Sequence, residues 1–260
     1  MGHIPSSQTG AGVMSVLRTD RLCRSFGNLV VTRDLSLEVQ RGERHIIIGP
    51  NGAGKTSLAN QIGGQLRPSS GRIFLEDVDI TGQSPDRINR LGIARTFQKN
   101  NLFPNLSILE NLRLAVQARR GHTLNCVRPV AHYSAVLDRA RELAAIVHIE
   151  GEGSRLVRHL SYGEQRQLEI GMALASEPKL LLLDEPTSGM SPLETQRMIE
   201  LIRDLPSDLA ILMIEHDMKV VFSLADRVTV LYYGEALASG TCAEVQASAR
   251  VREVYLGMAG

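Results

Sequence analysis

The chain has 260 residues, 43% of them hydrophobic, which is enough to bury one large core or two small ones. Its 29 basic and 28 acidic residues leave a net charge of +1, so no overall field would hold it on nucleic acid or on an anionic bilayer. The three cysteines are scattered without CxxC spacing, which indicates a reducing compartment and argues against a disulfide framework or a zinc site.

Residues 1–14 are expected to form a flexible extension, and residues 15–260 a single domain. The extension lacks the basic start and apolar run of a secretory signal. Met1-Gly2 with Ser6 matches the loose myristoylation pattern, but Met14 is an alternative natural start. Since no later window approaches the ~18 consecutive apolar residues of a membrane span, we expect a chain that is neither secreted nor integral to a membrane.

Residues 16–48 predict strands. Residues 16–39 alternate moderately between apolar and polar side chains, with turn residues at Gly27-Asn28, and this pattern favours short antiparallel strands. Residues 45–48 are a brief apolar run of the kind found in a buried parallel strand.

Residues 49–56 fit the pattern GxxxxGK[ST], between a predicted strand and a helical segment at residues 57–63. In such a loop, backbone N–H groups surround the β- and γ-phosphates and the helix N-terminus adds partial positive charge. Lys55 supplies a point charge, and the Thr56 hydroxyl is placed to coordinate Mg²⁺. The alternative is an ordinary glycine-rich turn, which would not require every position of the pattern. The predicted nucleotide-binding residues are Gly49, Pro50, Asn51, Gly52, Ala53, Gly54, Lys55, Thr56 and Ser57.

The pattern changes to helices after the predicted core strands, and we expect an α-helical subdomain over approximately residues 99–176. Apolar spacings of three and four recur at residues 108–119 and 136–147. Gln98 stands where the chain enters this insert. Its side chain is able to reach a metal or an attacking water, but the residues alone do not separate that role from a solvated loop.

Residues 180–183 form another buried apolar run, which ends in Asp184-Glu185. A P-loop needs an acidic partner for its metal at the end of a neighbouring strand. We predict that Asp184 holds Mg²⁺ through water and that Glu185 orients and deprotonates the attacking water. The alternative is that both carboxylates only solvate the end of the strand.

Strands are also predicted at residues 210–214 and 228–232, and helices at residues 192–204 and 243–256. This alternation indicates an α/β fold with a mainly parallel sheet. His216 follows the strand at 210–214, so a parallel sheet would place it on the same carboxyl edge as the P-loop and Asp184. From the residues alone, a contact with phosphate or water and a structural role are both open for His216.

With the P-loop, Gln98, LSYGEQ, LLLLDEP and His216 in this order, the chain resembles the ATP-binding subunits of ABC transporters from about residue 17 to residue 256. The resemblance implies a P-loop NTPase (RecA-like) core with an N-terminal antiparallel β subdomain and an inserted α-helical subdomain. It implies an ATPase that couples hydrolysis of ATP, with Mg²⁺, to transport.

The family's site residues map onto this chain by their motifs. Ser161 and the backbone at Gly163 match the signature motif, which binds the γ-phosphate of ATP held in a partner subunit's P-loop. Phe26 matches the aromatic residue that stacks on adenine, and His216 matches the switch histidine. Gln98 matches the glutamine that ligates Mg²⁺ and senses the membrane partner.

Two departures from the family pattern stand out. The usual signature is LSGGQ, but this chain has Tyr162 and Glu164 in place of a glycine and the glutamine. The loop after DEP usually ends in aspartate, where this chain has Ser191. The second departure bears on how hydrolysis is coupled across the dimer, and less on ATP binding.

Within the family, GIARTFQ, LSYGEQRQLEI and VREVYLG look most like the LivG-type subunits of branched-chain or hydrophobic amino acid importers. The resemblance implies a second ATPase subunit, identical or of LivF type, two permease subunits and, indirectly, a periplasmic binding protein. The subunit would then lie peripherally on the cytoplasmic face of the inner membrane, and residues 97–112 would receive a permease helix. Similar subunits serve urea or short-amide importers and a lipopolysaccharide exporter.

ATPases outside transport share the nucleotide motifs. Those of chromosome maintenance and DNA repair carry long coiled-coil arms, which an insert of this length cannot supply, so we expect no nucleic-acid partner. Translation factors of this class carry two cassettes in tandem, whereas this chain has one P-loop and one signature. A module that regulates without turnover is disfavoured by the intact Asp184-Glu185 pair with His216.

Overall fold

The computed structural model describes residues 15–96, 102–119, 134–149, 151 and 153–256. An antiparallel sheet of four strands, in the order β2-β1-β4-β5, occupies the N-terminal part of the chain. Its strands are β1 (Ser15–Phe26), β2 (Leu29–Gln40), β4 (Ser70–Leu75) and β5 (Val78–Asp79). β1 and β2 are 12 residues each, longer than the short strands expected, and β-bulges between them explain their imperfect alternation.

The central sheet has six strands in the order β10-β9-β3-β8-β7-β6. These are β3 (Arg44–Ile48), β6 (Ile93–Arg95), β7 (Leu180–Asp184), β8 (Ala210–Ile214), β9 (Arg227–Tyr232) and β10 (Glu235–Gly240). All neighbours pair in parallel except β10, which is antiparallel to β9. The predicted α/β class with a mainly parallel core is confirmed.

The strands of the central sheet separate two hydrophobic cores. Leu181 and Leu183 of β7 belong to the core beneath α6, whereas Leu180 and Leu182 belong to the core shared with the antiparallel sheet. Side chains alternate across a strand, so a continuous run of leucines supplies both cores. The run LLLL is therefore typical of a parallel strand that is buried on both faces.

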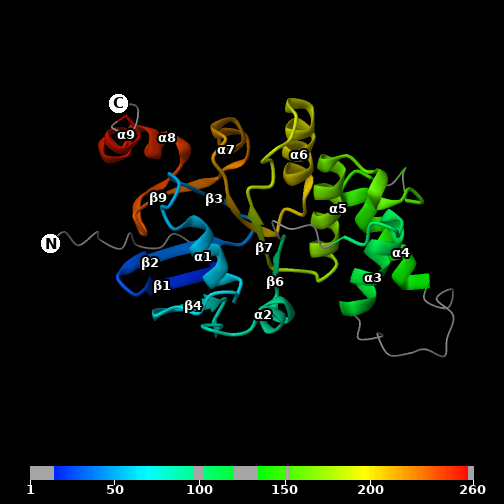
Figure 1. Cartoon of the computed structure of the whole chain (residues 1–260), viewed down its shortest axis with the longest axis horizontal. Helices are drawn as coiled ribbons and strands as arrows, with labels where there is room; N and C mark the ends of the chain where they lie inside the picture. The colour runs from blue at the N-terminus through cyan, green and yellow to red at the C-terminus, as the bar shows by residue number, and fades with distance from the viewer. Residues whose placement is uncertain (1–14, 97–101, 120–133, 150, 152, 257–260) are drawn as a thin grey trace.

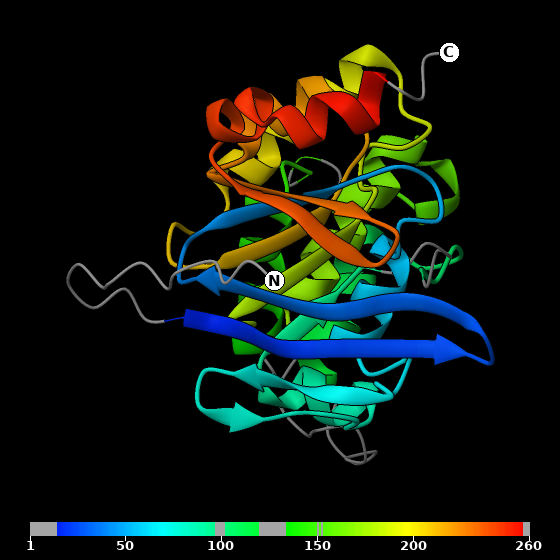
Figure 2. The same ribbon diagram turned by 90° about the vertical axis from the view of Figure 1, so that its left-hand side faces the viewer.

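Helices α6 (Pro192–Asp204), α7 (Met218–Leu224), α8 (Cys242–Ala247) and α9 (Ala249–Leu256) cover one face of the central sheet. The other face turns toward α1 (Lys55–Ile62) and the antiparallel sheet, as Figures 1 and 2 show. The single final helix predicted over residues 243–256 is wrong, because Ser248 adopts an extended conformation and divides it in two.

Between β6 and β7 the chain forms α3 (Ile108–Arg119), α4 (Ser134–Ile146), a short 3-10 helix η3 (Val157–His159) and α5 (Tyr162–Leu174). These helices lie together at one end of the molecule, and α2 (Pro85–Leu91) precedes β6 (Figure 1). Among the described residues, no helix combines the length and the apolar character needed to cross a membrane.

Candidate functional site

The carboxyl ends of three adjacent strands meet at one edge of the central sheet. β8 lies between β3 and β7, and Ile214 is in register with Ile47 on one side and with Asp184 on the other. The P-loop follows β3, Glu185 follows β7, and His216 follows β8. The structure therefore brings these predicted residues to one edge, where ligands of open α/β sheets bind.

The P-loop depends on glycine at two close approaches of the backbone. Gly49 and Gly54 have φ angles of 153° and 101°, and a Cβ atom on either would lie 2.3 Å from a carbonyl oxygen, of Leu231 and Val31 respectively. Gly54 is the N-cap of α1 and provides no side-chain cap, so the first N–H groups of the helix are left for an external acceptor. α1 begins at Lys55, two residues before the predicted start at residue 57.

Lys55 folds back over its own loop. Its Nζ donates to the carbonyl oxygens of Gly49 and Pro50, at 2.7 and 3.0 Å. Burial lowers the pKa of Lys55, while the negative charges of Glu185 and Asp184 oppose that shift. The ammonium group and both carboxylates therefore share one electrostatic site.

Asp184 is the last residue of β7 and its carboxylate is almost fully buried. Its Oδ2 pairs with Arg95 Nη2 at 3.0 Å, whereas its Oδ1 has no hydrogen-bond partner among the described residues. A buried acceptor without a partner is costly, and an oxygen ligand of this kind suits Mg²⁺ or one of its waters. Asp184, with Thr56 at the start of α1, thus fits the expected metal.

Glu185 occupies the left-handed region at φ 49°, an unusual conformation for a residue with a side chain. Its N–H donates to Ile214 O at 3.0 Å, which fixes the backbone against β8. Its Oε1 lies 3.8 Å from His216 Nδ1, and the His216 side chain is 60% exposed. The two groups are close to each other and remain accessible from solvent.

Two residues of this site were missed by the sequence analysis. Arg95 binds Asp184 and also donates to Asn60 Oδ1 and Gln65 Oε1, at 2.7 and 3.0 Å. Glu215 is fully buried, and its Oε1 accepts from the Thr187 hydroxyl at 2.6 Å. The only sequence signal was their position, three residues before Gln98 and directly before His216, because the ion pair of Arg95 with Asp184 and the bond of Glu215 to Thr187 join residues distant in the chain.

Glu215 joins the loops that follow β7 and β8. Its Oε1 also accepts from Thr187 N at 3.3 Å, and its Oε2 accepts from the N–H groups of His216 and Asp217, at 2.9 and 3.3 Å. A carboxylate only accepts hydrogen bonds, and here every neighbour named is a donor. The position of the His216 backbone therefore depends on Glu215.

Replacing Glu215 by glutamine is expected to destabilise the protein by about 1–3 kcal/mol, because the amide N–H₂ would face donors inside the protein. Chemical denaturation of the variant measures this change. Glu38→Gln, at an exposed position of β2, is the control and should change the free energy of unfolding little. A Glu215→Gln protein as stable as the unaltered chain would contradict the role given to this carboxylate.

The signature residues lie on a different element. Ser161 is the N-cap of α5, and a capping box joins it to Glu164: Glu164 N donates to Ser161 Oγ at 3.3 Å and Ser161 N donates to Glu164 Oε2 at 2.6 Å. Gly163 lies in the first turn. Figure 1 shows α5 and α1 on opposite sides of β7, so the signature start and the P-loop are separate sites within one chain.

The adenine-stacking candidate Phe26 ends β1 and is 49% exposed. The Arg24 guanidinium lies 4.4 Å from the centroid of the Phe26 ring and covers one of its faces. An exposed aromatic ring beside a cation suits stacking on a base. Gln98 lies outside the described residues.

Tyr162 now has defined neighbours. Its hydroxyl accepts from Arg166 Nη2 and Nε, at 2.8 and 3.0 Å, and a Cβ atom on Gly189 would lie 3.8 Å from its ring. Arg166 in turn donates to Glu169 Oε2 at 2.7 Å. Ser191, the other departure from the family pattern, is the N-cap of α6.

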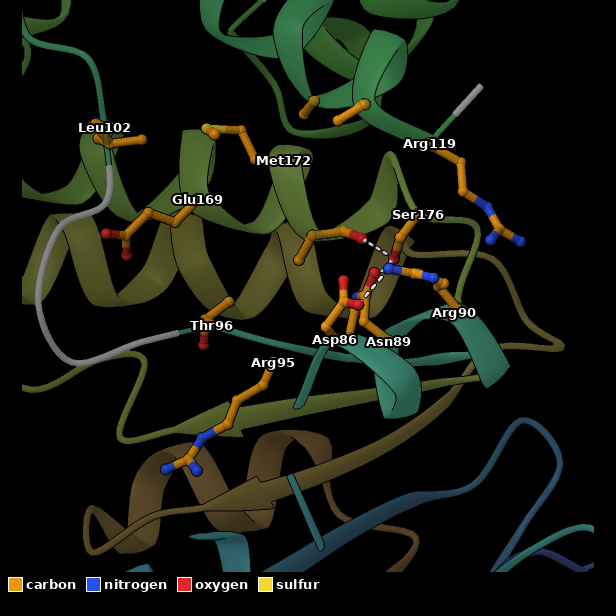
Figure 3. A pocket seen from close by; sticks show the side chains of 14 residues that line it. Asp86, Asn89, Arg90, Arg95, Thr96, Leu102, Arg119, Glu169, Met172 and Ser176 are labelled. Atoms are coloured by element: carbon orange, nitrogen blue, oxygen red, sulfur yellow. Dashed lines mark hydrogen bonds and ion pairs between the residues drawn. The ribbon is translucent and has the colours of Figure 1, made fainter. Parts of the chain in front are cut away.

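A groove with a volume of about 630 Å³ lies between the core elements α2 and β6 and the helices α3 and α5. Figure 3 shows Thr96, Leu102 and Glu169 toward one end, and Arg90 and Arg119 toward the other. Burial raises the pKa of Glu169, although its pairing with Arg166 opposes the shift. The groove is separate from the P-loop and connects to it through Arg95, which lines the groove and pairs with Asp184.

The family model described as ABC transporter matches residues 32–188, which include the P-loop, the signature and Asp184-Glu185. The chain belongs to the ABC transporter family. It is 37% identical to the high-affinity branched-chain amino acid transport ATP-binding protein LivG of Salmonella typhimurium, over 94% of this chain and 98% of that protein. It is 36% identical to BraF of Pseudomonas aeruginosa, with the same coverage.

Solved structures agree with this membership. The ADP conformation of an ATP-binding cassette of an ABC transporter covers 94% of this chain and 99% of its own, with a TM-score of 0.81 and 27% identity. A cassette of Clostridium perfringens, part of an ABC transporter complex, has a TM-score of 0.77, 26% identity and coverages of 93% and 95%. This ABC ATPase therefore has the family's P-loop fold.

Proposed function

We propose that this ABC ATPase powers the import of branched-chain or other hydrophobic amino acids through partner permeases. The choice of substrate is supported by the 36–37% identity of this chain to LivG and BraF proteins over 94% of its length. It would work on the cytoplasmic face of the membrane, held there by the permeases, with a periplasmic binding protein delivering the substrate.

The nucleotide site is proposed to be shared between two ATPase subunits. The P-loop starts α1 and the signature starts α5, on the two sides of β7. Two subunits arranged head to tail would set Ser161 and Gly163 of one against the γ-phosphate in the P-loop of the other. The partner subunit is either a second copy of this chain or a related ATPase.

Within each shared site we assign the following roles. Residues 49–57 and Phe26 bind ATP, and Gln98 contacts the metal and transmits the state of the permease. Glu185 deprotonates and orients the water for in-line attack on the γ-phosphate, and His216 contacts the phosphate beside it. The work of the protein is mainly positioning and charge stabilisation, as in P-loop enzymes generally.

Mg²⁺ is the proposed metal, with Thr56, Gln98 and Asp184 as its protein ligands, directly or through water. When bound, it would neutralise charge on the β- and γ-phosphates. Support comes from the unpartnered Oδ1 of Asp184. Mg²⁺ usually keeps several waters and is bound through one or two carboxylates and the substrate phosphates, so few protein ligands are needed.

The groove between the core and the helical elements is proposed to receive a permease helix. Its lining includes the apolar side chains of Leu102, Ala115 and Met172, and Figure 3 shows charged side chains toward both ends, Glu169 at one and Arg90 and Arg119 at the other. Such a lining suits an amphipathic helix. Leu102 belongs to the segment 97–112 for which the family resemblance implied this contact, and residues 97–101 of that segment lie outside the described residues.

A bulky residue in this groove is expected to release the permease. Ala118, an exposed residue of α3, lines the groove, and Ala118→Trp would fill it without entering the core. Copurification of the permease should fall about tenfold, as expected for the loss of ~1.4 kcal/mol, while ATP binding is retained. Ala145→Trp, at an exposed position of α4, is the matched control. Equal recovery of the permease with both variants would contradict docking in the groove.

The substrate is tested by transport. Cells that lack this chain should lose uptake of labelled leucine, and the unaltered chain should restore it where Lys55→Ala does not. Purification of the tagged native complex identifies the permease and the binding protein. Loss of urea uptake with leucine uptake intact, or recovery of the chain with ribosomes or nucleic acid, would overturn the proposal.

A further inference from the structure

Within the described part of the chain, three helices begin with a capping box: α5 with Ser161 and Glu164, α6 with Ser191 and Glu194, and α8 with Thr241 and Glu244. In each, the glutamate bonds back to the N-cap residue of its own helix. Glu194 also reaches a second helix. Its Oε1 accepts from Gly163 N, in the first turn of α5, at 3.1 Å.

The carboxylate of Glu194 is well held in this position. Its Oε2 accepts from Ser191 N and from Ser191 Oγ, at 3.0 and 2.8 Å. Hydrogen bonds from the Ser191 backbone and side chain, then from Gly163 N–H and the Ser161 hydroxyl, lower the pKa of Glu194 to about 2. Glu194 is therefore an anion at physiological pH.

Glycine at position 163 makes this approach possible. A Cβ atom there would lie 3.0 Å from both Cγ and Oε1 of Glu194 and 3.1 Å from its Cβ. Such contacts are tighter than side chains normally make. The first turn of α5 thus accommodates an anionic group beside the Gly163 N–H, and in this structure the group is a carboxylate of the same chain.

The Gly163 N–H and the Ser161 hydroxyl are also the groups assigned above to the γ-phosphate held by a partner subunit. We propose that Glu194 is an internal competitor for that phosphate: its carboxylate occupies the signature donors until a nucleotide-loaded partner displaces it. The inference rests on the proposed shared site. One N–H group satisfies one acceptor well, and two anions at one position repel each other, so carboxylate and phosphate exclude each other.

Ser191 fits the same arrangement. An aspartate at this position, usual in the family, would place a second carboxylate beside that of Glu194, and the two negative charges would repel each other. The serine hydroxyl instead donates to Glu194 Oε2 at 2.8 Å, in addition to the bond from the backbone N–H of residue 191. The serine at position 191 therefore helps to hold the Glu194 carboxylate where it accepts the Gly163 N–H of the signature.

Steady-state kinetics of the assembled transporter test the competition. Glu194→Ala is expected to lower the ATP concentration for half-maximal ATPase activity about tenfold, the factor of one charge-assisted hydrogen bond, with kcat changed much less. Glu194→Gln should fall between Glu194→Ala and the unaltered chain, because a neutral amide is a weaker acceptor. Glu244→Gln and Glu244→Ala remove the equivalent capping interaction at α8, remote from the signature, and should leave that concentration unchanged.

A second measurement addresses the contact itself. In the isolated chain without nucleotide, the amide proton of Gly163 should exchange with solvent faster in Glu194→Gln than in the unaltered chain or in Glu244→Gln. An unchanged or higher half-maximal ATP concentration in both Glu194 variants overturns the inference. If the transporter assembled with the unaltered chain showed no ATPase activity, the proposed function itself would be wrong. The two failures are therefore distinguishable.

Discussion

Glu185→Gln is expected to bind ATP with near-normal affinity and to hydrolyse it about 10²–10⁴-fold more slowly, the usual cost of losing a general base. The glutamine keeps the shape of the side chain, so the P-loop and its Lys55 should still hold the phosphates. The residue is fixed by its N–H bond to Ile214 O, and its side chain lies 3.8 Å from His216 Nδ1. Single-turnover hydrolysis and binding of a fluorescent nucleotide measure the two quantities separately.

Asp184→Asn is the informative comparison for Glu185→Gln. Because Asp184 pairs with Arg95 and presents its free Oδ1, this change should weaken the Mg²⁺ dependence of ATP binding as well as the rate. Near-normal turnover in Glu185→Gln would remove Glu185 from the role of base. Equal loss of ATP binding in both variants would show that the two carboxylates do not have separate functions.

Ser161→Arg is expected to leave ATP binding at its own P-loop intact and to reduce hydrolysis at the shared site by at least ~10²–10³-fold, the effect of losing one donor to the reacting group. A large cation at the N-cap of α5 would also prevent close approach of the partner subunit. The measurements are nucleotide binding by the isolated chain and ATPase activity of the assembled transporter.

Thr241→Arg is the matched control for Ser161→Arg. It replaces the N-cap residue of another capping box, at the start of α8, and should lower stability by about 1 kcal/mol without affecting turnover. Loss of nucleotide binding by the isolated Ser161→Arg chain would mean that Ser161 serves its own P-loop, and the shared site would then be wrong.

Much of the fold followed from local pattern. The strand at residues 210–214 and the helices at 108–119 and 192–204 have the bounds predicted for them. These segments are internally consistent, because apolar periodicity, capping residues and strand length all favour the same state. β10 was missed because Glu235–Gly240 is short and rich in small residues with low strand propensity, and its pairing with β9 decides its conformation.

The residues of the site also fall into a predicted group and a missed group. Lys55, Thr56, Asp184, Glu185 and His216 were predicted because a motif or the end of a strand marks each of them, and parallel strands align their carboxyl ends. Arg95 and Glu215 carry no such mark. Arg95 matters through its ion pair with Asp184, 89 positions away in the chain. Glu215 matters through its hydrogen bond from Thr187, 28 positions away.

The class of fold, the phosphate-binding loop and the family could be inferred from the amino acids alone, because each depends on residue types at fixed short spacings. The pairs of donors and acceptors that meet across the chain became known only from the folded arrangement: Arg95 with Asp184, Glu215 with the His216 N–H, and Glu194 with the Gly163 N–H. Hydrogen bonds act over about 3 Å, so a partner brought near by the packing of separate helices and strands leaves no trace in local spacing.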